Sequence, residues 1–108
     1  MQYPKDVVIV AGARTAHGKF KGSLFNTSAV DLGAIAIKDT LKQAELDPEL
    51  IDEVIMGNVL SAGIGQHPAR QSAIKAGIPE EIPALTVNKM CGSSMKAIML
   101  AANAIRAG

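Results

Sequence analysis

The sequence predicts an α/β fold, in which short buried strands alternate with helices. Three apolar runs have the length and the aliphatic content of buried strands, at residues 7–11, 54–56 and 84–87. Between and after these runs, apolar residues recur at helical spacing. This order of strand, helix, strand, helix, strand, helix is typical of parallel strands joined by right-handed crossovers.

The composition indicates one small domain with an aliphatic core. At 108 residues the chain is long enough for one core, and 48% of it is apolar while only 3% is aromatic. The net charge is +1 with scattered charges, so we expect no nucleic-acid partner. No apolar run reaches a membrane span, residues 1–6 lack a secretory signal, and one unpaired cysteine suits a reducing compartment. We therefore expect a cytoplasmic protein without membrane contact.

The first predicted strand, residues 7–11, leads into a long loop over residues 12–26. This loop has several glycines and basic residues and no apolar period. Long loops inside compact domains tend to be functional or to make contacts. We interpret its arginine, Arg14, as a structural residue that holds the loop down rather than as a site residue.

The first helix is predicted to begin after Ser28, which forms a capping box with Asp31. Asp47 and Pro48 then predict a short capped turn of helix before the second strand. The apolar face of the first helix comprises Val30, Gly33, Ala34, Ile37, Leu41 and Ala44.

The next helix is predicted to begin at Pro68 and to end before Gly77. Gly63 and Gly65 have the spacing of a dinucleotide-binding loop, but the third glycine is absent and Pro68 stands in its place. We therefore reject a dinucleotide site.

The last helix, predicted over residues 92–107, is apolar on nearly all sides. Lys96, Asn103 and Arg106 form its single narrow polar stripe. Such a helix must be buried nearly all round, and three short strands with two amphipathic helices cannot enclose it. We therefore expect the chain to be one part of a larger protein, with a dimer supplying part of the cover.

The only cysteine, Cys91, lies where the third strand meets the last helix. A helix start presents unpaired N–H groups and a partial positive charge, which favour a thiolate. Gly92 leaves room for a substrate carbonyl beside the sulfur and beside N–H groups that could hold an oxyanion. From the residues alone, Cys91 is either such a nucleophile or a small buried hydrophobe.

Four ordered motifs resemble the thiolases, the family of acetyl-CoA acetyltransferases and 3-ketoacyl-CoA thiolases. The segment Asn88-Lys89-Met90-Cys91-Gly92-Ser93-Ser94-Met95-Lys96-Ala97 resembles the family's nucleophile segment. Residues 12–20 resemble its first loop, residues 29–33 the start of its first helix, and residues 57–71 its second strand and following loop. The resemblance covers nearly the whole chain.

The resemblance implies a thiolase-like layered fold, α-β-α-β-α, of which this chain would form the opening β-α-β-α-β-α part of the first half. Residues 1–108 would then be the N-terminal part of the thiolase N-terminal domain, without the CoA-binding loop domain and the C-terminal half. Cys91 would be the catalytic residue that accepts an acyl group from acyl-CoA. The family's second cysteine, histidine and asparagine would lie elsewhere, so we expect the isolated chain to be inactive.

The implied reaction is the condensation of two acetyl-CoA molecules to acetoacetyl-CoA, or the reverse thiolysis of a 3-ketoacyl-CoA, in lipid metabolism. CoA thioesters would be substrates, and no separate cofactor or metal is expected. The resemblance also implies a homo-oligomer, a dimer or tetramer, through the strand before Cys91. A catalytically silent segment that acts only in assembly is the alternative. Met90, Ser94 and Met95 depart from the residues common in the family and leave the acyl-chain length open.

Two histidines, His17 and His67, are the available candidates for a base. The resemblance places the family's base near its C-terminus, and His67 falls where asparagine is more usual. No carboxylate or cysteine stands at ligand spacing from both histidines, so no metal site is predicted. We interpret both as solvated loop histidines.

Overall fold

The computed structural model describes residues 6–108, so most of the segment inspected for a secretory signal lies outside the described residues. Its elements follow the predicted order after the first loop, and their bounds agree with the predictions to within a few residues. They are α1 (Ala29–Ala44), the 3-10 turn η1 (Pro48–Leu50), β1 (Val54–Gly57), α2 (Pro68–Lys75), β2 (Ala84–Val87) and α3 (Ser93–Ala107).

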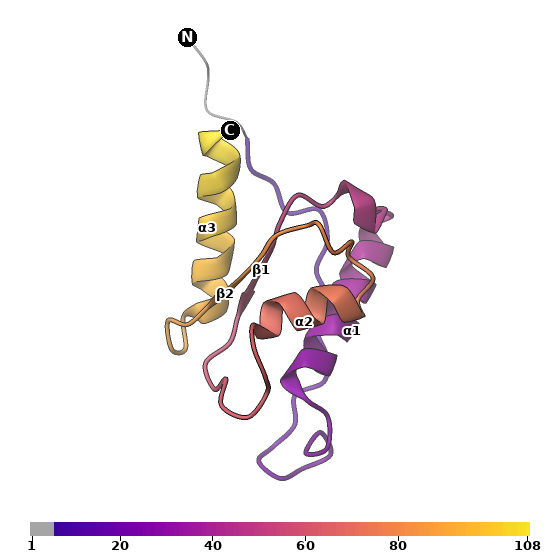
Figure 1. Ribbon diagram of the computed structural model, residues 1–108, viewed down its shortest axis with the longest axis vertical. Helices are drawn as coiled ribbons and strands as arrows, with labels where there is room; N and C mark the ends of the chain where they lie inside the picture. The colour runs from indigo at the N-terminus through magenta and orange to yellow at the C-terminus, as the bar shows by residue number, and fades with distance from the viewer. Residues whose placement is uncertain (1–5) are drawn as a thin grey trace.

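The two strands form a parallel pair, and α2 is the crossover between them. The register runs from Val54 opposite Ala84 to Gly57 opposite Val87. In Figure 1, α1 and α2 lie on one side of the strands and α3 lies on the other. The helix α3 packs mainly on β1, whereas α2 contacts both strands and also packs along α1. The described chain is therefore a three-layer α-β-α arrangement with a very narrow sheet.

The core lies between the strands and the α1–α2 pair. Val54, Ala73 and Ile78 are its buried centre, and Ile37 and Leu41 of α1 pack against them. These α1 residues belong to the predicted apolar face, which is therefore confirmed. The side chain of Ser28 caps α1 by accepting a hydrogen bond from the backbone N–H of Asp31 at 3.0 Å.

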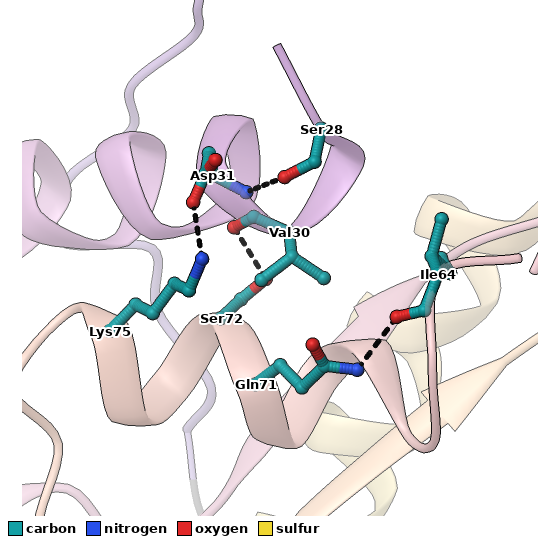
Figure 2. A network of polar contacts seen from close by, with 7 residues as sticks. All are labelled: Ser28, Val30, Asp31, Ile64, Gln71, Ser72 and Lys75. Atoms are coloured by element: carbon teal, nitrogen blue, oxygen red, sulfur yellow. Dashed lines mark hydrogen bonds and ion pairs between the residues drawn. The ribbon is translucent and has the colours of Figure 1, made fainter.

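Polar contacts hold α1 and α2 together (Figure 2). The buried hydroxyl of Ser72 donates to the carbonyl of Val30 at 2.9 Å, and the Lys75 ammonium lies 2.7 Å from the Asp31 carboxylate. A Cβ added to Gly33 would lie 2.6 Å from the Ser72 hydroxyl oxygen. A glycine at this position therefore lets the two helices approach closely.

The predicted first strand is wrong. Residues 7–11 are irregular and pair with no strand of the described chain, and Val8, Ile9 and Val10 are 69–81% exposed. Of the three predicted parallel strands, only the second and the third pair with each other in the described chain. A β-branched run favours extended backbone, but a ladder needs a neighbouring strand at hydrogen-bonding distance. None of the described strands provides one.

The described chain covers only one side of α3. Ser93 and Ala97 are buried, whereas Met95, Ile98 and Met99 are more than half exposed. An open pocket of about 1050 Å³ runs between α3 and the η1–β1 segment. The expectation that these elements cannot enclose the last helix is confirmed. Within residues 6–108 no helix combines the length and the apolarity that crossing a bilayer requires.

Candidate active site

The chain passes from β2 into α3 through a tight turn over residues 88–92. Met90 is in the left-handed region with φ 48°, where few residues with a side chain are found. The carboxamide oxygen of Asn88 accepts from the backbone N–H of Met90 at 3.0 Å, and the Gly92 N–H donates to the Lys89 carbonyl at 3.0 Å. Asn88 therefore stabilises the unusual backbone conformation that precedes the cysteine.

Ser93 closes this turn from the helix side. Its buried hydroxyl accepts from the backbone N–H of Lys89 at 2.9 Å and donates to the carbonyl of Met90 at 2.6 Å. The backbone N–H of Ser93 donates to the same carbonyl at 3.1 Å. Cys91 thus lies in a short turn that the Ser93 side chain closes through its bonds to the backbone of Lys89 and Met90.

Cys91 is a free, exposed cysteine directly before the N-cap residue of α3, Gly92. The predicted place of Cys91 at the helix start is therefore confirmed to within two residues, since α3 begins at Ser93. Among residues 6–108, no acceptor takes the backbone N–H groups of Ser94 and Met95, and the first bond of the helix joins Lys96 to Gly92. The exposure contradicts a small buried hydrophobe, the alternative that the sequence left open for Cys91.

Gly57 sets the distance between the end of β1 and the first turn of α3. A Cβ added to Gly57 would lie 2.6 Å from the backbone nitrogen of Ser94 and 2.7 Å from the carbonyl carbon of Ser93. These are backbone atoms of a helix, which cannot move without displacing the turn beside them. Because Gly57 has no side chain, the first turn of α3 can lie close to the end of β1, and this fixes the position of Cys91.

The segment after β1 is tied to the cysteine turn. The backbone N–H of Asn58 donates to the carbonyl of Val87 at 2.9 Å, which extends the ladder by one bond. The Asn58 amide donates to the Ser61 hydroxyl at 2.7 Å, and the Asn88 amide reaches the Val59 carbonyl at 3.4 Å. The two asparagines thus join the ends of both strands.

Two residues of α2 fix the loops on either side of it. The guanidinium of Arg70 donates to the carbonyls of Ile82 (2.9 Å) and Glu80. The amide of Gln71 donates to the carbonyls of Ile64 (2.9 Å, Figure 2) and Gln66 (2.7 Å). In the sequence both residues stand out only as part of the motif at residues 57–71, because contacts from a side chain to the backbone leave no periodic signal.

The interpretation of His67 as a solvated loop histidine is wrong in part. His67 is exposed, yet it is the N-cap of α2, and both ring nitrogens lie within 3.2 Å of polar atoms of α2 and β2. His17 is exposed in the first loop, where the Arg14 guanidinium donates to the carbonyl of its neighbour Thr15 and to no other group within residues 6–108. Neither histidine has a hydrogen bond to Cys91 in the described part of the chain, and that part holds no cluster of three metal-ligating side chains.

Comparisons with known proteins agree with this geometry. A family model described as "Thiolase, N-terminal domain" matches residues 7–108. The chain is 63% identical over 103 residues to an acetyl-CoA acetyltransferase of Cupriavidus necator and 56% identical over 104 residues to one of Escherichia coli K12. These matches cover 95% and 96% of the chain but only 26% of each relative, so the chain spans about a quarter of their length.

A solved structure has the same fold. It is the Acat5 thiolase from Ascaris suum in complex with coenzyme A, with a TM-score of 0.94 and 47% identity. The superposition covers 96% of this chain and 27% of that one. The predicted α/β fold class is therefore confirmed, apart from the missing first strand.

Proposed function

The chain belongs to the thiolase family, and on that basis we propose that Cys91 is the nucleophile of acyl transfer between CoA thioesters. The observation that carries this proposal is the turn itself. It presents an exposed sulfur directly before a helix, on a backbone held by Asn88 and Ser93. A nucleophilic cysteine has to be accessible and held in position, and a helix start is a typical place for one.

In the proposed first step, a general base takes the proton of the Cys91 thiol, and the sulfur attacks the carbonyl carbon of an acyl-CoA thioester. The bond from that carbon to the CoA sulfur breaks, and CoA leaves and takes up a proton from a general acid. The acyl group is then a thioester on Cys91. The free N–H groups of the first turn of α3 are the proposed donors to the oxyanion that forms in between.

In the proposed second step, a base removes a proton from the α-carbon of acetyl-CoA. That carbon attacks the acyl carbon on Cys91, a carbon–carbon bond forms, and the bond to the Cys91 sulfur breaks. The products are acetoacetyl-CoA, when the acyl group is acetyl, and free Cys91, whose sulfur takes up a proton from the protonated base. The reverse sequence is thiolysis of a 3-ketoacyl-CoA. Since Cys91 is the only cysteine of the 108 residues, we assign the other acid and base groups to protein outside them.

The names of the relatives support the substrate class. Two of them are acetyl-CoA acetyltransferases, and the solved thiolase was crystallised with coenzyme A. We propose that residues 1–108 act as the opening part of such an enzyme in cytoplasmic lipid metabolism, with CoA thioesters as substrates. We also propose a homo-oligomer that forms through β2, the strand before Cys91.

A chimaera tests the proposal. Residues 7–108 replace the matching segment of the Cupriavidus necator acetyltransferase, and thiolysis of acetoacetyl-CoA is measured for the chimaera and for the 108-residue chain alone. We expect an active chimaera and an inactive isolated chain. Cys91→Ser in the chimaera should reduce kcat by at least about 10⁴-fold, as loss of a nucleophile does, whereas Ser23→Ala in the exposed first loop should have no effect.

A folded, oligomeric chimaera without activity would contradict the proposal and favour a silent assembly segment. Wild-type activity of Cys91→Ser would contradict the role of the cysteine. Activity of the isolated chain would contradict the assignment of the acid and base groups to other parts of the protein.

A further inference from the structure

His67 bridges the start of α2 and the strand β2. It adopts the left-handed conformation, with φ 52° and ψ 70°, which histidine enters more readily than most residues. Its Nδ1 lies 3.2 Å from the backbone nitrogen of Arg70 and 3.0 Å from the hydroxyl oxygen of Thr86. Its Nε2 lies 3.0 Å from the carbonyl oxygen of Ala84.

These partners determine where the imidazole proton lies. The Ala84 carbonyl only accepts, so Nε2 carries the proton and donates to it. The Arg70 N–H only donates, so Nδ1 is unprotonated and accepts from it. The hydroxyl of Thr86 already accepts from the backbone N–H of Ala69 at 3.1 Å, which leaves its own proton for Nδ1. Every donor has an acceptor only when the ring is neutral and protonated on Nε2.

The same contacts also satisfy a carbonyl on the outer edge of β2. Pro83 and Val87 direct their carbonyls to β1, as their bonds to Val54 and Asn58 show. Because carbonyls alternate along a strand, the Ala84 carbonyl lies on the opposite edge, where His67 takes it. His67 and Thr86 together also cap two N–H groups of α2 that lack partners within the helix, those of Ala69 and Arg70.

We propose that neutral His67, protonated on Nε2, is a positioning residue for Cys91. It fixes β2 to the start of α2 at Ala84 and Thr86. Cys91 follows four residues after Val87, the last residue of β2. A shift of β2 along its axis would break both contacts and move the turn that presents the sulfur. The catalytic part of this inference rests on the proposed function, whereas the state of the ring does not.

Nuclear magnetic resonance of the 108-residue chain tests the state of the ring. With ¹⁵N-labelled histidine at pH 8, we expect one histidine, His67, with a protonated Nε2 and an unprotonated Nδ1, and one, His17, whose two ring tautomers exchange. The chain has only two histidines, so His17→Asn assigns the signals. Averaged signals for both, or a proton on Nδ1 of His67, would overturn the proposal.

Kinetics of the chimaera test the positioning role. We expect His67→Ala to lower kcat by about tenfold, because a small displacement of a reacting group costs one to two orders of magnitude. KM should stay within about twofold. His67→Asn should recover part of the loss, since asparagine tolerates the left-handed conformation and caps helices, but is too short to replace the bond to Ala84. His17→Ala is the matched control and should have no effect.

Thr86→Val keeps the side-chain volume and removes the hydroxyl, so it tests the same network if His67→Ala does not fold. It should also lower kcat with KM unchanged. Wild-type kcat in both variants would overturn the positioning role. The outcome is separate from that of Cys91→Ser: if Cys91→Ser is inactive while His67→Ala and Thr86→Val are normal, only this inference fails, and if Cys91→Ser is active, the proposed function fails.

Discussion

The two faces of the sheet differ in how much cover the chain gives them. On the α1–α2 face, Val30, Ala34, Ala69, Ala73 and Ile78 are buried, and a buried hydroxyl and an ion pair join the two helices. On the α3 face, most large apolar side chains are exposed, and the pocket beside β1 is open. The first face thus carries the buried core under two helices, whereas the second carries α3 alone (Figure 1), whose outward apolar side chains are exposed.

The cysteine lies on the uncovered side, and polar contacts hold it there. Asn88 and Ser93 fix its turn through hydrogen bonds to the backbone, and Gly57 allows the turn to sit against β1. The burial of apolar side chains contributes little to the position of Cys91, which is itself exposed. Most residues that stabilise this chain are therefore not those that set the geometry of its candidate site, and Gly57 is a residue that does both.

The largest difference in the free energy of unfolding should be found between variants of two isoleucines, one on each face. Ile78 is 3% exposed beside the core, whereas Ile98 on α3 is 60% exposed. We expect Ile78→Ala to lower the free energy of unfolding by about 2–4 kcal/mol, and Ile98→Ala to change it by no more than about 0.5 kcal/mol. Urea denaturation of the 108-residue chain measures both. Similar losses for the two variants would contradict the contrast between the faces.

Gly57 should matter both for stability and for the site. We expect Gly57→Ala to lower the free energy of unfolding by about 1–3 kcal/mol, because its methyl group overlaps the first turn of α3. It should also change the rate at which iodoacetamide alkylates Cys91. The control is Gly12→Ala, since a Cβ there meets nothing within 4 Å. If the two variants behaved alike, Gly57 would not position the turn.

The smallest effect should come from the ion pair between α1 and α2. Hydrogen bonding from Lys75, then from Ser28, and then the charge of Lys75 hold the pKa of Asp31 below its ordinary value. A lowered pKa in the folded state stabilises the protein above the unfolded pKa of about 4, and this stabilisation is lost as the pH falls through the folded value.

We therefore expect Asp31→Asn to flatten the dependence of stability on pH below about pH 4, measured by thermal unfolding between pH 5 and pH 2. Lys75→Met should flatten it as well, whereas Lys38→Met on the exposed side of α1 should not. Added salt should weaken the effect, because both groups are about half exposed. An unchanged pH profile in Asp31→Asn would mean that the pair does not contribute.

Local signals predicted most of the fold. Ser28, Pro48 and Pro68 marked the starts of α1, η1 and α2, and each element begins where expected. The aliphatic runs at 54–56 and 84–87 are strands. Residues 7–11 have the same composition and are not a strand, because pairing depends on a neighbour that composition cannot reveal.

The candidate site was predicted only in part. The place of Cys91 before a helix follows from the strand, the glycine and the apolar helix around it. The roles of His67, Arg70 and Gln71 were missed, since most of their partners are distant in the sequence. Arg70 bonds to Ile82, 12 residues away, and His67 contacts Thr86, 19 residues away. Gly57 was noted in a motif, but its close approach to Ser94 is a property of packing.

Trapping of the acyl group on Cys91 is the decisive measurement. The chimaera is mixed with acetyl-CoA, quenched in acid, digested and analysed by mass spectrometry, with the Cys91→Ser variant treated in parallel. We expect a single acetyl group on the peptide that contains Cys91, and none in the variant. An active chimaera whose acetyl group is found on another residue, or which never carries one, would contradict this expectation.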